Sequence, residues 1–81
     1  MRVVAFHSNS FDEYNEWART EEKIFQRLVT LIRDTRRTPF EGIGKPEPLK
    51  GDFACCWSRR ITDEHRLVYK VSNEAIIITL L

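Results

Sequence analysis

The stretch KPEPLK, residues 45–50, places one carboxylate, Glu47, between two prolines, with a lysine at each end. A carboxylate beside cations suits cleavage of a phosphodiester by an internal 2′-hydroxyl. The carboxylate removes the hydroxyl proton, and the cations stabilise charge that develops on the phosphate oxygens. The flanking prolines restrict the backbone of Glu47, which lowers the entropy lost in positioning it. Taken alone, the pattern is also typical of a solvated loop.

Two predicted strands, 53–61 and 66–71, supply further cations. Neighbouring residues of a strand point to opposite faces, so Arg66 and Lys70 share one face of the second strand, and its apolar residues share the other. We expect helices to cover the apolar face. If Arg60 lies beside Arg66 across the hairpin, the open face of the sheet carries a small cationic patch.

The long segment 36–52 joins the last predicted helix to this sheet and contains all three prolines and all three glycines of the chain. Such turn-forming composition predicts a loop, and loops of this length in small domains are often functional. Because the loop leads into the sheet, it can bring Glu47 and Lys50 to the basic face.

The remaining periodicities predict the elements that position these side chains. We expect strands over 2–6, 53–61, 66–71 and 75–81 and helices over 10–18 and 21–36. In the first helix, Ser10 is the expected N-cap and Glu13 completes a capping box; Thr20 is the expected cap of the second. The order β-α-α-β-β-β predicts an α+β domain in which an antiparallel sheet packs against two N-terminal helices. The expected core includes Phe11, Trp17, Leu28, Ile32 and Leu67.

Length and composition limit the possible classes of protein. The 81 residues predict a single domain, 1–81, and the net charge of +1 does not by itself indicate a partner. The absence of an apolar run of about 20 residues argues against a membrane span, and we interpret the N-terminus as a strand, not a signal peptide. The adjacent Cys55 and Cys56 should point to opposite faces of a strand. They match neither a disulfide framework nor a metal motif, so reduced thiols of a cytoplasmic protein are expected.

The run DTRRTPFEGIGKPEPLKGDFACCWSRRITDEHRLVYKV, residues 34–71, resembles the YoeB/Txe family of bacterial toxins in the RelE/ParE superfamily. The most specific parts are RTPFEGIGKPEPLK, WSRRI and DEHRLVY; residues 1–33 match more loosely, with the same order of elements. The resemblance implies a RelE-like fold and a ribosome-dependent endonuclease for messenger RNA. It also implies a cognate antitoxin of the YefM or Phd kind and no metal or organic cofactor, and it leaves open whether the chain forms a homodimer.

The resemblance also implies roles for four residues. The glutamate of the Lys-Pro-Glu-Pro motif, here Glu47, is the family's proposed general base. The arginine of the His-Arg-Leu-Val-Tyr motif, here Arg66, stabilises the transition state. Two further cations contact phosphate: Arg60, the second arginine of the Trp-Ser-Arg-Arg motif, and Lys50, which closes the proline motif.

One departure concerns the general acid. Members of the family end in a tail of Arg-Tyr-His-Tyr type whose histidine has this role, whereas this sequence stops at Leu81. His65 is not expected to replace it, since it adjoins Arg66 in sequence and would point to the opposite face. His7, before the first helix, is expected in a turn. From this departure we expect impaired cleavage with antitoxin binding retained.

Three functions therefore stay open at the level of sequence. The first is an RNA-cleaving toxin. The second is a non-catalytic module that still binds the antitoxin and the ribosome. The third is a gyrase poison, as in the ParE branch of the superfamily. The presence of Glu47, Arg60 and Arg66 together favours the first over the third.

Overall fold

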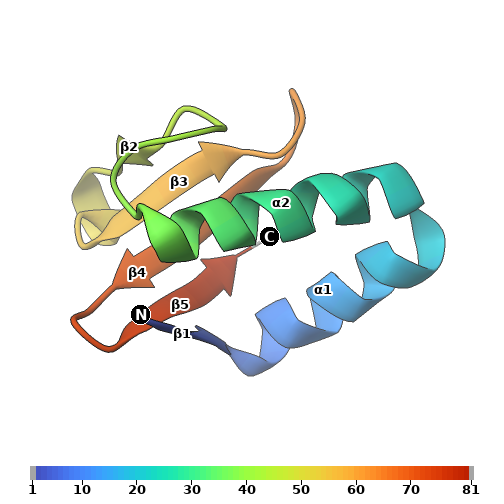
Figure 1. The fold of residues 1–81 in the computed structure, drawn as a ribbon, viewed down its shortest axis with the longest axis horizontal. Helices are drawn as coiled ribbons and strands as arrows, with labels where there is room; N and C mark the ends of the chain where they lie inside the picture. Colours follow the sequence, from blue (N-terminus) through green and yellow to red (C-terminus); the bar gives the residue numbers. More distant parts are fainter. Residues whose placement is uncertain (1, 81) are drawn as a thin grey trace.

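The protein is described by a computed structural model that covers residues 2–80, in which two helices lie side by side over one face of a five-stranded sheet (Figure 1). Its elements are β1 (Val3–Phe6), α1 (Ser8–Thr20), α2 (Glu22–Arg37), β2 (Glu47–Pro48), a 3₁₀ turn (Gly51–Phe53), β3 (Cys56–Arg60), β4 (Arg66–Val71) and β5 (Ala75–Leu80). Leu81, predicted to end the last strand, lies outside the described residues. Neither described helix has the length and apolar character needed to cross a bilayer.

The sheet has the strand order β1-β5-β4-β3-β2. The hairpins β3–β4 and β4–β5 are antiparallel, as predicted. The short strand β2 also pairs with β3 antiparallel, whereas β1 pairs with β5 in parallel. The α+β class with helices on one face is therefore confirmed, and the sheet is mixed at one edge. Apolar alternation specifies which face of a strand is buried, but it carries no information on strand direction.

The ends of the helices differ from the predicted caps. His7, not Ser10, is the N-cap of α1, and its side chain forms no capping bond. Ser10 lies inside the first turn, fully buried, and its hydroxyl donates a hydrogen bond to the carbonyl of Thr79 at 2.7 Å. Thr20 ends α1 and donates to the carbonyl of Glu16 at 2.9 Å. Both predicted caps are wrong, because α1 begins before Ser10 and the N-cap of α2 is Glu21, one residue after Thr20.

The core lies between α2 and the central strands. Its buried residues are Leu28, Leu31, Ile32, Ile61, Leu67, Tyr69, Ile76 and Ile78. The prediction is confirmed for Leu28, Ile32 and Leu67, and a half-buried Trp17 packs against their cluster. Phe11 is 53% exposed, and its ring only meets the edge of Phe6. The prediction that Phe11 belongs to the core is therefore wrong, although α1 itself packs against β5 and β1.

Candidate active site

Part of the predicted loop forms a strand. Glu47 and Pro48 form the short edge strand β2, in which Glu47 pairs with Ser58 of β3 and Pro48 with Trp57. Next in the chain, the amide of Leu49 donates to the carbonyl at residue 56 over 2.9 Å. Proline tolerates an edge strand because no neighbour needs its missing N–H, and it favours extended backbone in the preceding residue. Glu47 is thereby fixed in a definite register beside β3.

The register brings three predicted site residues onto one face. Arg60 is paired directly with Arg66, as expected, and the neighbouring row joins Glu47, Ser58 and Val68. Directly paired residues point to the same face, and alternate rows are about 7 Å apart along a strand. Glu47 therefore lies one row from the two arginines on the face that the helices leave uncovered.

Lys50 is less closely placed. It follows β2 on the side away from the arginine row, immediately before the 3₁₀ turn, and is exposed. The structure thus groups Glu47, Arg60 and Arg66 and leaves Lys50 at the end of the same hairpin. The two candidate histidines also lie away from these three residues. His7 is the N-cap residue of α1, and the ring of His65 packs edge-on with that of Trp17, with 4.9 Å between the ring centroids.

The grouped cations have free hydrogen-bonding capacity. Among residues 2–80, the ion pairs are Glu16–Arg19, Asp34–Arg37 and Asp34–Arg59, and none uses Glu47, Arg60 or Arg66. Arg60 is half-buried, and its Nε is the one side-chain polar atom in this described part that is buried without a partner. A buried donor without an acceptor is costly, so an anion that reaches Nε would remove that cost.

Arg59, the preceding residue, is fully buried on the helix-covered side. Its Nη1 donates to Oδ2 of Asp34 at 2.7 Å and to the carbonyl of Ile43 at 3.1 Å. Its Nη2 donates to the carbonyls of Thr38 at 2.6 Å and Glu41 at 2.9 Å. Its Nε donates to the hydroxyl of Tyr69 at 3.2 Å. All five guanidinium hydrogens are thus used, and the partners hold the loop that leads to β2.

Arg59 and its hydrogen-bond partners form a clamp on the loop that leads to β2, and Asp34 and Gly42 complete this clamp. Burial alone raises the pKa of Asp34, but hydrogen bonds from Arg59, from the amide of Ile43 and from Arg37 outweigh burial and lower that pKa below 3.8. Gly42 has a φ of +125°, and a Cβ there would lie 2.1 Å from Oδ2 of Asp34. Two residues after Gly42, the carbonyl of Gly44 accepts a hydrogen bond from the backbone amide of Arg60 at 2.7 Å.

Sequence reasoning did not find this clamp. It placed the two arginines on opposite faces of a strand but assigned no partner to Arg59. A usable signal was present, because consecutive arginines on a half-covered strand require one guanidinium on the core side, where it must find acceptors. Asp34 and the carbonyls of the glycine-rich loop are those acceptors.

The two cysteines depart from the expected alternation. Cys55 lies in the turn before β3 and is exposed, whereas Cys56 begins the strand and is buried. Their Sγ atoms are 3.9 Å apart because a turn residue does not follow strand geometry. Both are free thiols, and burial raises the pKa of Cys56.

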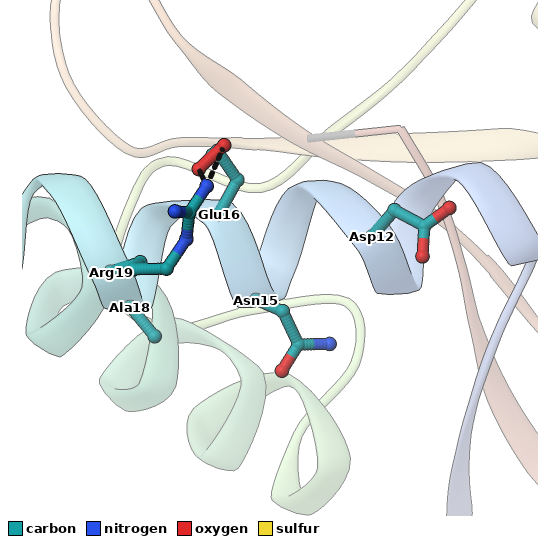
Figure 2. A pocket seen from close by; sticks show the side chains of 5 residues that line it. All are labelled: Asp12, Asn15, Glu16, Ala18 and Arg19. Carbon is teal, nitrogen blue, oxygen red and sulfur yellow. Dashed lines mark hydrogen bonds and ion pairs between the residues drawn. The ribbon is translucent and has the colours of Figure 1, made fainter.

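A surface hollow of about 530 Å³ lies along the exposed side of α1, away from these residues. It is lined by Asp12, Asn15, Glu16, Ala18 and Arg19, and Figure 2 shows Arg19 turned toward Glu16, with which it forms an ion pair. None of the predicted site residues contributes to it. The open face of the sheet, not this hollow, therefore carries the candidate chemistry.

Comparison with known proteins gives consistent matches over nearly the whole chain. Residues 6–81 match the family described as YoeB-like toxin of bacterial type II toxin–antitoxin system. The toxin YoeB of Escherichia coli (strain K12) is 55% identical over 78 residues, which cover 96% of this chain and 92% of that protein. A YoeB/ParE toxin from Agrobacterium tumefaciens superimposes with a TM-score of 0.92 at 46% identity, covering 99% of this chain and 94% of that one. A toxin from the heterotetrameric YoeB–YefM toxin–antitoxin complex of Staphylococcus aureus superimposes with a TM-score of 0.90 at 34% identity, covering 99% and 93%.

Proposed function

Since this chain belongs to the family of YoeB-like toxins of bacterial type II toxin–antitoxin systems, we propose that it acts as a ribosome-dependent endoribonuclease on messenger RNA in the cytoplasm. One observation carries the proposal. A carboxylate, Glu47, lies one row from the paired Arg60 and Arg66 on the uncovered face, and Nε of Arg60 is buried without a partner in the described part of the chain. Base and cations are thus close enough to act on one phosphodiester.

The reaction proceeds by attack of the neighbouring 2′-oxygen on phosphorus. Glu47 takes the 2′-hydroxyl proton, the new bond from the 2′-oxygen to phosphorus forms, and the bond from phosphorus to the 5′-oxygen breaks. A solvent water gives a proton to the departing 5′-oxygen, and the resulting hydroxide takes the proton from Glu47, which leaves a 2′,3′-cyclic phosphate and a 5′-hydroxyl. Arg66 stabilises the charge on the non-bridging oxygens, and Arg60 and Lys50 hold phosphate groups of the strand.

Primer extension on a message under translation tests this role. The wild-type chain should produce discrete cuts that require ribosomes, and Glu47→Ala should reduce cleavage about 10²–10⁴-fold, the usual cost of losing a general base. Glu13→Ala removes an exposed carboxylate of α1 and is the matched control. Ribosome binding without cleavage would support a non-catalytic module instead, and inhibition of DNA supercoiling would support a gyrase poison.

We further propose that the partner is a small, partly disordered antitoxin of the YefM kind that becomes ordered on binding. The YoeB–YefM complex of Staphylococcus aureus supports this class of partner. The cations of the open face form no ion pair among residues 2–80 and would attract acidic groups of such a chain. Arg60→Glu with Arg66→Glu should abolish capture of the product of the adjacent gene, whereas Arg36→Glu on the exposed side of α2 should not. Unchanged capture by the double variant would place the interface elsewhere.

A further inference from the structure

A second hollow, of about 350 Å³, lies on the open face of the sheet, next to the candidate active site. Its base is formed by Cys56 of β3 and Thr79 of β5, and the turn before β3 borders it with Phe53 and Cys55. This turn lies on the side of the sheet away from the helices (Figure 1). Neither the proposed reaction nor the fold makes use of the hollow.

The register fixes its distance from the reacting groups. Cys56 pairs with Lys70, which also lines the hollow, and this row is the next one along β3 from Ser58, the partner of Glu47. Alternate rows are about 7 Å apart. The order on the open face is therefore the arginine pair, then Glu47, then the hollow, so that an RNA strand lying along β3 would pass all three.

The chemistry of the hollow differs from that of the arginine row. Lys70 and Asp52 both line it with opposite charges, so it has little net attraction for a phosphate. Phe53 is 48% exposed, so its ring is accessible to a ligand that enters the hollow. Exposed aromatic rings in RNA-binding proteins stack on bases. The hydroxyl of Thr79 donates its hydrogen to the carbonyl of Val68 at 2.9 Å, so its oxygen can accept from a base edge, and the imidazole of His7 offers a further hydrogen bond. The volume is at the lower end for ligand pockets, which fits a single base.

We propose that this hollow is a subsite for a nucleobase of the RNA adjoining the cleaved phosphodiester. Phe53 stacks on the base, and the polar groups of His7, Lys70 and Thr79 distinguish its edge. The inference rests on the proposed nuclease function, which it extends from cleavage to sequence preference.

The first test is a cleavage profile. Ribosomes are programmed with messages that carry each of the four bases on either side of the cut, and kcat/KM is measured for the wild-type chain and Phe53→Ala. Loss of one base stack should lower kcat/KM about tenfold and reduce the differences between bases at one flanking position. Phe11→Ala, whose ring is 53% exposed on α1, is the matched control and should match wild type. An unchanged profile in Phe53→Ala would overturn the subsite.

The second test does not depend on cleavage. Cys55 is an exposed thiol that lines the hollow, whereas Cys56 is buried, so iodoacetamide should react at Cys55 first. Short single-stranded RNA oligonucleotides, bound to saturation as judged by fluorescence anisotropy, should slow this alkylation in wild type and Glu47→Ala but not in Phe53→Ala. Protection without any cleavage by the wild-type chain would refute the proposed nuclease and retain the subsite. Equal alkylation with and without RNA, or no RNA binding, would overturn the subsite while cleavage still tests the nuclease.

Discussion

Two consecutive arginines of β3 have opposite surroundings. Arg59 points under the helices, is fully buried and donates every guanidinium hydrogen to a protein acceptor. Arg60 points to the open face and lies beside Arg66, and its buried Nε has no partner among residues 2–80. The two residues are of the same type and adjacent in sequence, so the difference in their burial and bonding comes from the face of the strand to which each side chain points.

The number of unused hydrogen-bond donors distinguishes a structural arginine from one that is able to bind a ligand. A guanidinium whose donors are all used stabilises one arrangement of its partners and has nothing left for a ligand. A guanidinium with an unused donor costs free energy in the unliganded protein, and a phosphate would repay it. Arg59 therefore holds the loop that precedes Glu47, and we propose that Arg60 binds a phosphate at the open face.

The largest expected effect is a loss of cleavage activity from a substitution on the open face that leaves the stability of the fold unchanged. Arg66→Ala should lower cleavage of ribosome-bound message about 10²–10³-fold, as the loss of a group that stabilises developing charge does. Its melting temperature should stay close to that of wild type, since Arg66 is exposed and forms no ion pair among residues 2–80. Quantitative primer extension and thermal denaturation measure the two quantities. A large fall in melting temperature would mean that Arg66 is structural.

The next largest effect is a loss of stability from a substitution on the face that the helices cover. Arg59→Met removes all five hydrogen bonds of that side chain and leaves Asp34 with the exposed Arg37 as its remaining ion-pair partner among residues 2–80, which should lower the free energy of unfolding by about 3–5 kcal/mol. Urea denaturation measures this, with the exposed Arg36→Met of α2 as control. A loss below 1 kcal/mol would contradict the role of Arg59 as the clamp of the loop.

The contrast also marks the limits of sequence reasoning. Alternation in β4 predicts the face of Arg66 correctly because side-chain direction is a local property of a strand. The pairing of Arg60 with Arg66, which the sequence left as a condition, is the one observed. The parallel pairing of β1 and the burial of Ser10 depend on which distant segment arrives nearby, and local patterns do not encode that. The roles of Glu47, Lys50, Arg60 and Arg66 stay predictions, supported for three of them by their shared face.

The third prediction concerns pH and the covered face. The folded-state pKa of Asp34 lies below its ordinary value of 3.8, so its carboxylate stabilises the fold fully above that value. This contribution is lost as pH falls below 3.8 through the lowered pKa, because the proton then binds the unfolded state first. Urea denaturation from pH 6 to pH 3 should show a steeper loss in wild type than in Asp34→Asn, which cannot titrate there. Parallel curves would show that other carboxylates dominate acid unfolding.

The smallest expected effect returns to Arg60. Arg60→Met removes a buried donor that has no acceptor, so the free energy of unfolding should change by less than about 0.5 kcal/mol or rise slightly, in contrast to Arg59→Met. Loss of one phosphate contact should make the slope of log K against log salt for single-stranded RNA shallower by about 0.7. Fluorescence anisotropy between 50 and 300 mM salt measures that slope, and Arg36→Met should leave it unchanged. If Arg60→Met instead destabilised the fold by several kcal/mol at an unchanged slope, Arg60 would be a second structural arginine, and the distinction between the two faces would fail.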